Sequence, residues 1–357
     1  MCIIFLYFCD NPTPDGYRLI IASNRDEFYS RPTAFAKFWS KNPSVIAGMD
    51  LEAGREGGTW LGMTKDGKFA AITNYRQAPK FTDPNATGRG HLVPDFLEGD
   101  GNVRKYLENV SSNADRYNGF NLLAGMLSKG GDSKVGWYCN VEEKAVKMLS
   151  PGIHVLSNKV LNCSWPKMVY GRKRFADILG QVYTKQELID KLIGLLTVRD
   201  RSFTCGDDTS FIGPQDEGCN MNMVNACRAI FVNCKEIKYG TRTNTVVLVD
   251  AVGHVTYVER SMEDGATDPD KAEWRLATHE FDIQEKNDCT GTGFLLDTTA
   301  KENIPKKLVE NITNSKAAAR DDQEHFRKAA KKRPLTNGCS RSAMEPADKV
   351  TMQEKKE

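Results

Sequence analysis

The chain has 357 residues, 40% of them hydrophobic, and a formal net charge of +2. This size and composition allow a sizeable buried core, and the nearly balanced charge gives no reason to expect a nucleic-acid partner. The ten cysteines form no CxxC pair and follow no secretory leader, so we expect reduced thiols in a soluble cytoplasmic protein. The apolar opening at residues 3–8 is too short to span a membrane, and no later apolar run approaches about twenty residues, so we expect no transmembrane segment.

The amino end combines a cysteine with this apolar run. Removal of Met1 would leave Cys2 as the first residue, with a thiol and a free α-amine. Such a residue can supply both a nucleophile and a base, since the α-amine has a pKa of ~7.7–8.0 and the thiol one of ~8.5. The other interpretation is that Cys2 only begins a buried strand, as a small hydrophobic residue.

A hairpin is predicted next. Turn-forming residues at 10–16 separate the first apolar run from a second at 17–23, which ends in the polar cluster 24–27. In an antiparallel pair the start of one strand lies beside the end of the next, so the cluster should lie close to Cys2. The sequence therefore predicts a candidate active site at the open end of this hairpin.

The polar cluster reads Asn24-Arg25-Asp26-Glu27. If the strand continues through it, Asn24 and Asp26 share one face while Arg25 and Glu27 share the other, so only one pair can face the thiol. The alternative is a solvated loop with an internal Arg-Asp pair.

Strand patterns dominate the first half of the chain, and helical patterns follow. Further strands are expected at 60–64, 69–73, 121–126, 135–139, 145–149, 153–157, 245–249 and 254–260. Helices are expected at 167–179 and at 188–196, the second opened by a capping box at 184–187. Residues 204–224 follow neither period and are interpreted as a long loop or lid. This order of elements favours an α+β sheet sandwich covered by helices.

The composition changes toward the carboxyl end. From about residue 316 Lys, Arg, Glu, Asp and Ala dominate, and hardly any large apolar residue remains to offset the entropy of ordering. We therefore expect one domain over residues 1–290 and an extension over 291–357 that is disordered from about residue 316.

Several short segments together resemble the NRDE family, also called the transport and Golgi organisation protein 2 family. The similarity covers roughly residues 1–285 and rests on the start Met1-Cys2 and on the segments Asn24–Glu27, Gly57–Gly62, Thr73–Arg76, Tyr117–Leu122, His154–Asn158 and Tyr239–Thr243. The resemblance implies an N-terminal-nucleophile-like αββα sandwich, similar to the fold of the choloylglycine hydrolases.

The more distant resemblance to choloylglycine hydrolases implies a catalytic set. Those enzymes use an N-terminal Cys, an Asp after the second strand, two Asn residues and a late Arg, and this chain offers Cys2, Asp26, Asn74, Asn158 and Arg242 in that order. Asp26 could hold the α-amine of Cys2 through a charge-assisted hydrogen bond. Asn74 could donate to a developing oxyanion, and Asn158 could position the same centre.

Anion binding is the second role expected at this site. Arg242 could lower the pKa of the thiol or clamp an anionic ligand, and Asn24 and Arg25 are further candidate ligand-binding residues. One position departs from the choloylglycine pattern, because Ser23 stands where those enzymes place an Arg. No metal site is expected, since the five histidines have no ligand spacing.

Two functions of different classes follow. The family resemblance implies haem trafficking and lipid homeostasis in the cytoplasm, mitochondria and Golgi-related compartments, so we expect a soluble protein that binds an apolar anionic ligand. That ligand would be haem, as a transported molecule, or an acyl lipid, and no cofactor would be required. The alternative is an N-terminal cysteine amidohydrolase that cleaves a linear amide with Cys2 as the nucleophile.

Overall fold

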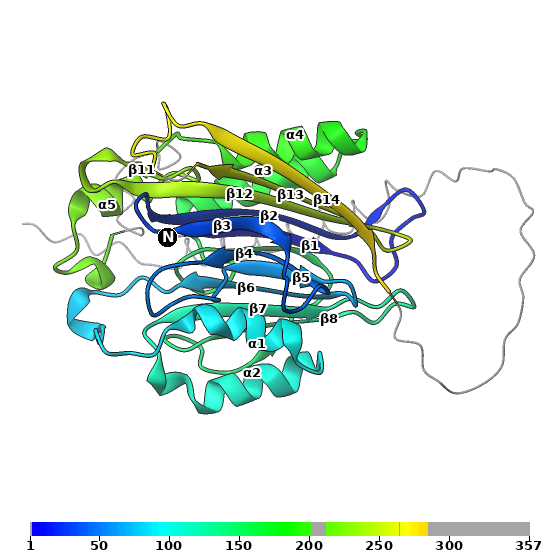
Figure 1. Ribbon diagram of the computed structural model, residues 1–357, viewed down its shortest axis with the longest axis horizontal. Coiled ribbons are helices and arrows are strands. Elements are labelled where there is room, and N and C mark those ends of the chain that lie inside the picture. Colours follow the sequence, from blue (N-terminus) through cyan, green and yellow to red (C-terminus); the bar gives the residue numbers. More distant parts are fainter. Residues whose placement is uncertain (1, 202–211, 264, 285–357) are drawn as a thin grey trace, which may run out of the picture. The chain divides into compact units, whose positions relative to one another are not determined.

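The computed structural model describes residues 2–201, 212–263 and 265–284 (Figure 1). The predicted extension at 291–357, with its expected disorder, lies outside these residues, as does the 204–211 part of the expected loop.

The strands are β1 (Ile3–Phe8), β2 (Tyr17–Phe28), β3 (Thr33–Phe38), β4 (Val45–Asp50), β5 (Leu61–Thr64), β6 (Lys68–Asn74), β7 (Phe120–Met126), β8 (Lys134–Cys139), β9 (Lys147–Met148), β10 (Gly152–Leu156), β11 (Asn233–Cys234), β12 (Tyr239–Asp250), β13 (His254–Met262) and β14 (Trp274–Asp282). The α-helices are α1 (Leu92–Glu98), α2 (Val103–Ser112), α3 (Pro166–Leu179), α4 (Lys185–Leu196) and α5 (Met221–Ala226). Short 3₁₀ helices are η1 (Pro79–Phe81), η2 (Arg89–His91), η3 (Ala114–Arg116), η4 (Pro214–Asp216) and η5 (Lys235–Ile237).

The strands form two antiparallel sheets. The first has the order β10-β1-β2-β12-β13-β14, with β11 paired to β12, so it joins both ends of the described chain. The second has the order β3-β4-β5-β6-β7-β8-β9, in which every neighbour is also the next strand in sequence. The expected hairpin of β1 and β2 is confirmed, with Ile3 opposite Asn24 and Phe8 opposite Leu19.

Helices cover the outer face of each sheet, which gives four layers. Helices α3 and α4 pack on the first sheet, and α1 and α2 pack on the second (Figure 1). Along β1 the side chains alternate between two cores: Ile3 and Phe5 face the helices, whereas Ile4 and Leu6 face the other sheet. A third core lies between the second sheet and its own helices. The predicted αββα sandwich of N-terminal-nucleophile type is therefore confirmed.

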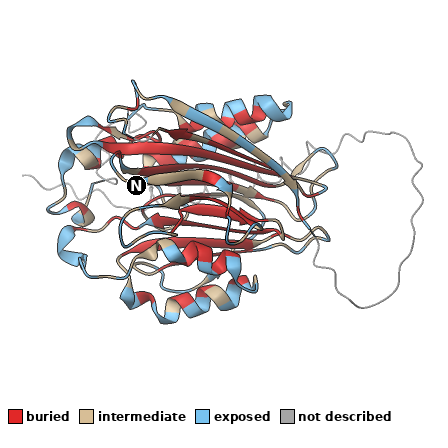
Figure 2. Cartoon of the chain, in the orientation of Figure 1, coloured by how far each residue is buried: buried red, intermediate tan, exposed pale blue. Residues whose placement is uncertain are grey.

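The two predicted helices are confirmed, and the reason is local. Thr184 caps α4 through a hydrogen bond from the backbone N–H of Glu187, whose carboxylate in turn accepts from the N–H of Thr184. Helix α3 begins at Pro166, a residue that suits the first helical position because it lacks an N–H. The outward faces of these helices are exposed while their inward faces are buried (Figure 2).

Other elements differ from the sequence prediction. The strand expected at 145–149 is only the two-residue β9, and the expected loop at 204–224 contains η4 and part of α5 in its described portion. Strands β3, β4 and β14 and helices α1 and α2 were not predicted. Asn102 caps α2 by accepting a hydrogen bond from the N–H of Lys105 at 3.0 Å, which is a signal that the sequence does contain.

Candidate functional site

Cys2 lies at the open end of the β1–β2 hairpin, between β2 and β10. Its carbonyl oxygen accepts a hydrogen bond from the hydroxyl of Ser157 at 2.8 Å, which fixes the start of β1 beside the end of β10. Burial raises the pKa of the Cys2 thiol, and the nearby Asp26 carboxylate raises it further. The thiol is thus held in its protonated form at neutral pH and needs a base to become a nucleophile.

Asp26 is buried on the helix-facing side of β2. Its Oδ1 accepts a hydrogen bond from the Thr241 hydroxyl at 2.6 Å, and its backbone carbonyl accepts one from the Tyr239 hydroxyl at 3.0 Å. Burial raises the pKa of Asp26, whereas the Lys167 ammonium and the Thr241 hydroxyl act in the opposite direction. The carboxylate is therefore firmly positioned and sensitive to the charges placed beside it.

Asn24 shares the helix-facing side with Asp26, as strand alternation predicts. Its amide NH₂ donates to the carbonyls of Leu196 and Ile230 at 2.8 and 3.0 Å, and its amide oxygen accepts from Asn244 at 2.7 Å. These bonds use all of its amide donors within the protein. Asn24 therefore links β2 to the last residue of α4 and to the segment after α5, and neither hydrogen of its side-chain NH₂ is left to bind the expected ligand.

Arg25 points to the opposite face, toward the second sheet. Its guanidinium stacks on the ring of Trp60 at 4.2 Å and donates to the hydroxyl of Thr33 at 3.2 Å. It lies within electrostatic range of the Cys2 thiol, and burial lowers its pKa, although arginine stays charged at neutral pH. Arg25 is therefore a buried cation beside the candidate nucleophile.

The two asparagines predicted for catalysis are joined at the ends of β6 and β10. Asn158 is buried and donates through its NH₂ to the backbone carbonyl of Asn74 at 2.7 Å. Asn74 is exposed, and its side-chain oxygen accepts a hydrogen bond from Nε of Arg89 at 2.8 Å. Because Arg89 occupies the oxygen, the NH₂ of Asn74 is the end left to act as a donor.

Arg242 is the extra residue of a β-bulge in β12. The bulge lies between Thr241, paired with Asp26, and Thr243, paired with Arg25. Its guanidinium donates to the backbone carbonyls of Phe28 and Arg31. The structure thus places Arg242 as a brace for the turn after β2, within electrostatic range of Arg25.

Arg89 and Arg55 were not singled out from the sequence. Arg89 lies within electrostatic range of the Cys2 thiol and of Arg55. The guanidinium of Arg55 lies against the backbone of Gly88, where an added Cβ would be 2.1 Å from its Nη1. The segment Gly88-Arg89-Gly90 lies between β6 and α1, so only tertiary packing brings it to Cys2.

Lys167 is a third residue that the sequence reading did not assign to the site. It is fully buried in the first turn of α3 and lies within electrostatic range of Asp26. A signal was present, because Lys167 occupies the same helical stripe as Gly171, Phe175 and Ile178, all of which are buried.

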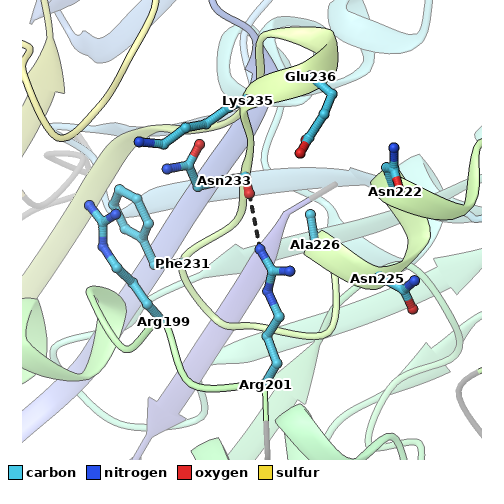
Figure 3. A pocket seen from close by; sticks show the side chains of 9 residues that line it. All are labelled: Arg199, Arg201, Asn222, Asn225, Ala226, Phe231, Asn233, Lys235 and Glu236. Atoms are coloured by element: carbon cyan, nitrogen blue, oxygen red, sulfur yellow. Dashed lines mark hydrogen bonds between the residues drawn. The ribbon is translucent and has the colours of Figure 1, made fainter.

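A separate cavity of about 390 Å³ lies near α5 and β11 (Figure 3). It is lined by Arg199, Arg201, Asn222, Asn225, Ala226, Phe231, Asn233, Lys235 and Glu236. None of the residues predicted from the sequence lines it. Two of its cations are already paired with carboxylates, since Lys235 lies 3.1 Å from Asp268 and Arg199 lies 2.5 Å from Asp270. We therefore place the candidate site at Cys2 rather than in this cavity.

Residues 2–201, 212–263 and 265–284 bear on metal ligation and on membrane insertion. No group of three or more His, Cys, Asp or Glu side chains in them could hold a metal ion. No helix in the described part of the chain is both long and apolar enough to cross a bilayer.

The four layers, with a cysteine at the start of an inner strand, define the fold as N-terminal-nucleophile-like. Sequence comparison adds the family: a family model described as Transport and Golgi organisation 2 matches residues 1–264, and the chain belongs to this family. The human homologue of that name is 42% identical over 289 residues, covering 80% of this chain and all of the relative. The Drosophila melanogaster protein is 31% identical over 294 residues, covering 80% of this chain and 99% of its own.

Solved structures give more distant similarities. A conjugated bile acid hydrolase from Clostridium perfringens has 12% identity and a TM-score of 0.36, covering 81% of this chain and 100% of its own. A Caenorhabditis elegans orthologue of N-acylethanolamine-hydrolyzing acid amidase also has 12% identity and a TM-score of 0.36, covering 55% of this chain and 86% of its own.

Proposed function

We propose that this protein binds an apolar anionic ligand beside Cys2, either haem or an acyl lipid, without the help of a cofactor. Its role would be haem trafficking or lipid homeostasis in the cytoplasm, mitochondria or Golgi-related compartments. The relatives' names, which refer to transport and Golgi organization, agree with such a role. The observation that carries the proposal is a cluster of arginines, two of which, Arg25 and Arg89, lie within electrostatic range of the Cys2 thiol.

Five arginines make up this cluster. They are Arg25, Arg31, Arg55, Arg89 and Arg242, linked through mutual electrostatic range and through the hydrogen bond from Arg242 to the carbonyl of Arg31. The carboxylates among them are Glu27, Asp50 and Glu52, of which Asp50 binds Arg31 at 2.7 Å. Like charges held close together repel one another, and the repulsion is relieved when an anion binds among them.

Arg89 offers the sharpest test of anion binding. Arg242 also supports the turn after β2, so its substitution would mix folding with binding, whereas the Arg89 side chain donates to the exposed side chain of Asn74. We expect Arg89→Gln to weaken binding of haem or of a long-chain acyl thioester by about tenfold or more, the effect of losing one charge-assisted hydrogen bond. Cys2→Ala should have little effect, because a carrier does not need the nucleophile.

Calorimetric titration of both ligands measures these effects. Arg104→Gln is the matched control, since Arg104 is an exposed arginine of α2 that pairs with Glu108. Affinity for acyl ligands should rise with chain length, by roughly 0.8 kcal/mol for each buried methylene. Absence of uptake of either ligand by the wild-type protein would refute the proposal.

A second candidate function is that of an N-terminal cysteine amidohydrolase acting on a linear amide. One specific observation favours it: the Cys2 thiol lies within electrostatic range of Asp26, and the Cys2 carbonyl is bound by Ser157, whose neighbour Asn158 binds the carbonyl of Asn74. This function first requires that Met1 be removed, which an intact mass measurement would show. Amide cleavage that disappears in Cys2→Ala while ligand uptake is absent in the wild type would favour this function over the carrier.

A further inference from the structure

Lys167 is a buried amine that neither proposed function uses. Its side chain is 1% exposed. Its Nζ makes no hydrogen bond within the part of the chain that the structure describes. It also lies in the first turn of α3, where the positive end of the helix dipole disfavours a second positive charge. Burial of an amine without a hydrogen bond costs free energy, so nearby groups must compensate its charge.

The groups around Lys167 come from several elements. Two thiols lie within electrostatic range of Lys167, those of Cys163 before α3 and Cys227 after α5, and so do the charged groups of Arg76 and Asp26. Arg76 is already matched, because its Nε lies 3.0 Å from Oδ1 of Asp216 and its Nη2 donates to Oδ2 at 3.1 Å. Asp26 is the carboxylate among the groups that act on the Lys167 ammonium.

Asp26 also adjoins the start of β1. The pairing of Ile3 with Asn24 sets the backbone of Cys2 next to the end of β2, and the Cys2 thiol lies within electrostatic range of Asp26. Arg25, which points to the other side of β2, adds positive charge near Cys2. Glu27 adds negative charge near Asp26. Once Met1 is removed, the α-amine of Cys2 and the side chain of Lys167 share one carboxylate.

One carboxylate balances only one ammonium, and an uncompensated buried charge is strongly disfavoured. Burial lowers the pKa of Lys167, while Cys227 and Asp26 act in the opposite direction. The α-amine starts from a lower ordinary pKa, ~7.7–8.0 against ~10.4 for lysine, so with Asp26 beside both amines the α-amine is the first to lose its proton.

We propose that Lys167 is a positioning residue that shares Asp26 with the mature amino terminus and so keeps the α-amine of Cys2 neutral at physiological pH. In that form the amine can accept the thiol proton: the S–H bond of Cys2 breaks, an N–H bond forms, and a thiolate and an ammonium result. The use of this base rests on the second candidate function, amide hydrolysis, whereas the charge balance does not depend on any ligand.

The titration of the α-amine tests the proposal directly. Brief labelling of the full chain with acetic anhydride at pH values from about 5 to 9, read by mass spectrometry of the amino-terminal peptide, gives the pH midpoint of the amine. We expect a wild-type midpoint below ~7.7 and a rise of about one unit in Lys167→Met, the size of effect that a nearby charge has on a pKa. Lys167→Arg keeps the charge and should stay near the wild type.

Lys173→Met is the matched control, because Lys173 is an exposed lysine of the same helix. Its midpoint should equal that of the wild type. Lys167→Gln serves as a second neutral variant, and circular dichroism verifies that each variant is folded. A folded Lys167→Met with an unchanged midpoint would overturn the proposal, and so would retention of Met1. Failure of haem or acyl thioester binding leaves these midpoints unaffected, so the two failures can be told apart.

Discussion

At the scale of single residues, Glu259 on β13 illustrates what burial does to a carboxyl group between two sheets. Its side chain is 2% exposed, and its Oε1 accepts a hydrogen bond from the backbone N–H of Ala36 at 2.8 Å. Burial raises the pKa of Glu259 to about 7, while Arg25 acts in the opposite direction. The folded protein therefore holds a proton at a pH where the unfolded chain has lost it.

This difference makes stability depend on pH. Glu259 in the unfolded chain has a pKa of about 4.3, so between that value and about 7 the folded state binds more protons, and the free energy of unfolding falls as pH rises. Glu259→Gln removes this dependence. We expect the stability of the variant relative to the wild type to increase by about 2–3 kcal/mol between pH 5 and pH 8.

Urea unfolding of both proteins at the two pH values measures the effect. Glu108→Gln, which alters an exposed carboxyl group of α2, is the control and should show no such trend. A difference between Glu259→Gln and the wild type that is the same at both pH values would contradict the prediction.

At the scale of elements, two helical glycines have opposite surroundings. Gly171 of α3 faces β1, where an added Cβ would lie 2.5 Å from the ring of Phe5. Gly194 of α4 has nothing within 4 Å of the same position. The first glycine lets a helix approach a sheet, whereas the second has no packing role.

Alanine substitution should therefore change stability in opposite directions. Gly194→Ala should stabilise the protein by about 0.5–1 kcal/mol, the gain in helix propensity. Gly171→Ala should destabilise it by about 1–3 kcal/mol, because the overlap with Phe5 outweighs the same gain. Thermal or denaturant unfolding compares the two variants, and a stabilised Gly171→Ala would show that the contact between α3 and β1 is loose.

Local signals explain which elements the sequence could predict. The β1–β2 hairpin has two long apolar runs around a cluster of turn formers, and α4 has its capping box at Thr184, so both were anticipated. Strand β14 was not, because it is an edge strand whose residues alternate weakly, and α1 has only 7 residues. Short or half-exposed elements depend on tertiary packing more than on their own pattern.

The candidate site divides in the same way. Cys2 and Asp26 could be brought together by reasoning, because hairpin register is a local property. Arg89 could not, since it arrives from a loop whose position depends on the packing of the whole second sheet. Helical periodicity could have predicted the burial of Lys167, because it shares a stripe with apolar residues of α3. A lysine in the first turn of a helix is otherwise expected to be exposed to solvent.

At the scale of the whole molecule, we expect the carboxyl-terminal tail to add little to the stability of the folded domain. The family match ends at residue 264, and the composition beyond about residue 316 lacks the apolar residues that would add to a core. We therefore expect a chain truncated at about residue 310 to unfold at nearly the same temperature as the full chain. Calorimetry of both chains measures this, and a large drop in the midpoint would show that the tail docks on the folded domain.

The strand order also has a consequence for synthesis on the ribosome. The second sheet runs from β3 to β9 without a break, so its partners emerge one after another. Strands β1 and β2 pair with each other early, but the second neighbour of β1 is β10, and the second neighbour of β2 is β12, which ends at Asp250. At roughly 5–20 residues per second, the nascent amino terminus therefore stays outside a completed sheet for on the order of ten seconds or more. An aminopeptidase can act on Met1 during that interval, before Cys2 is enclosed.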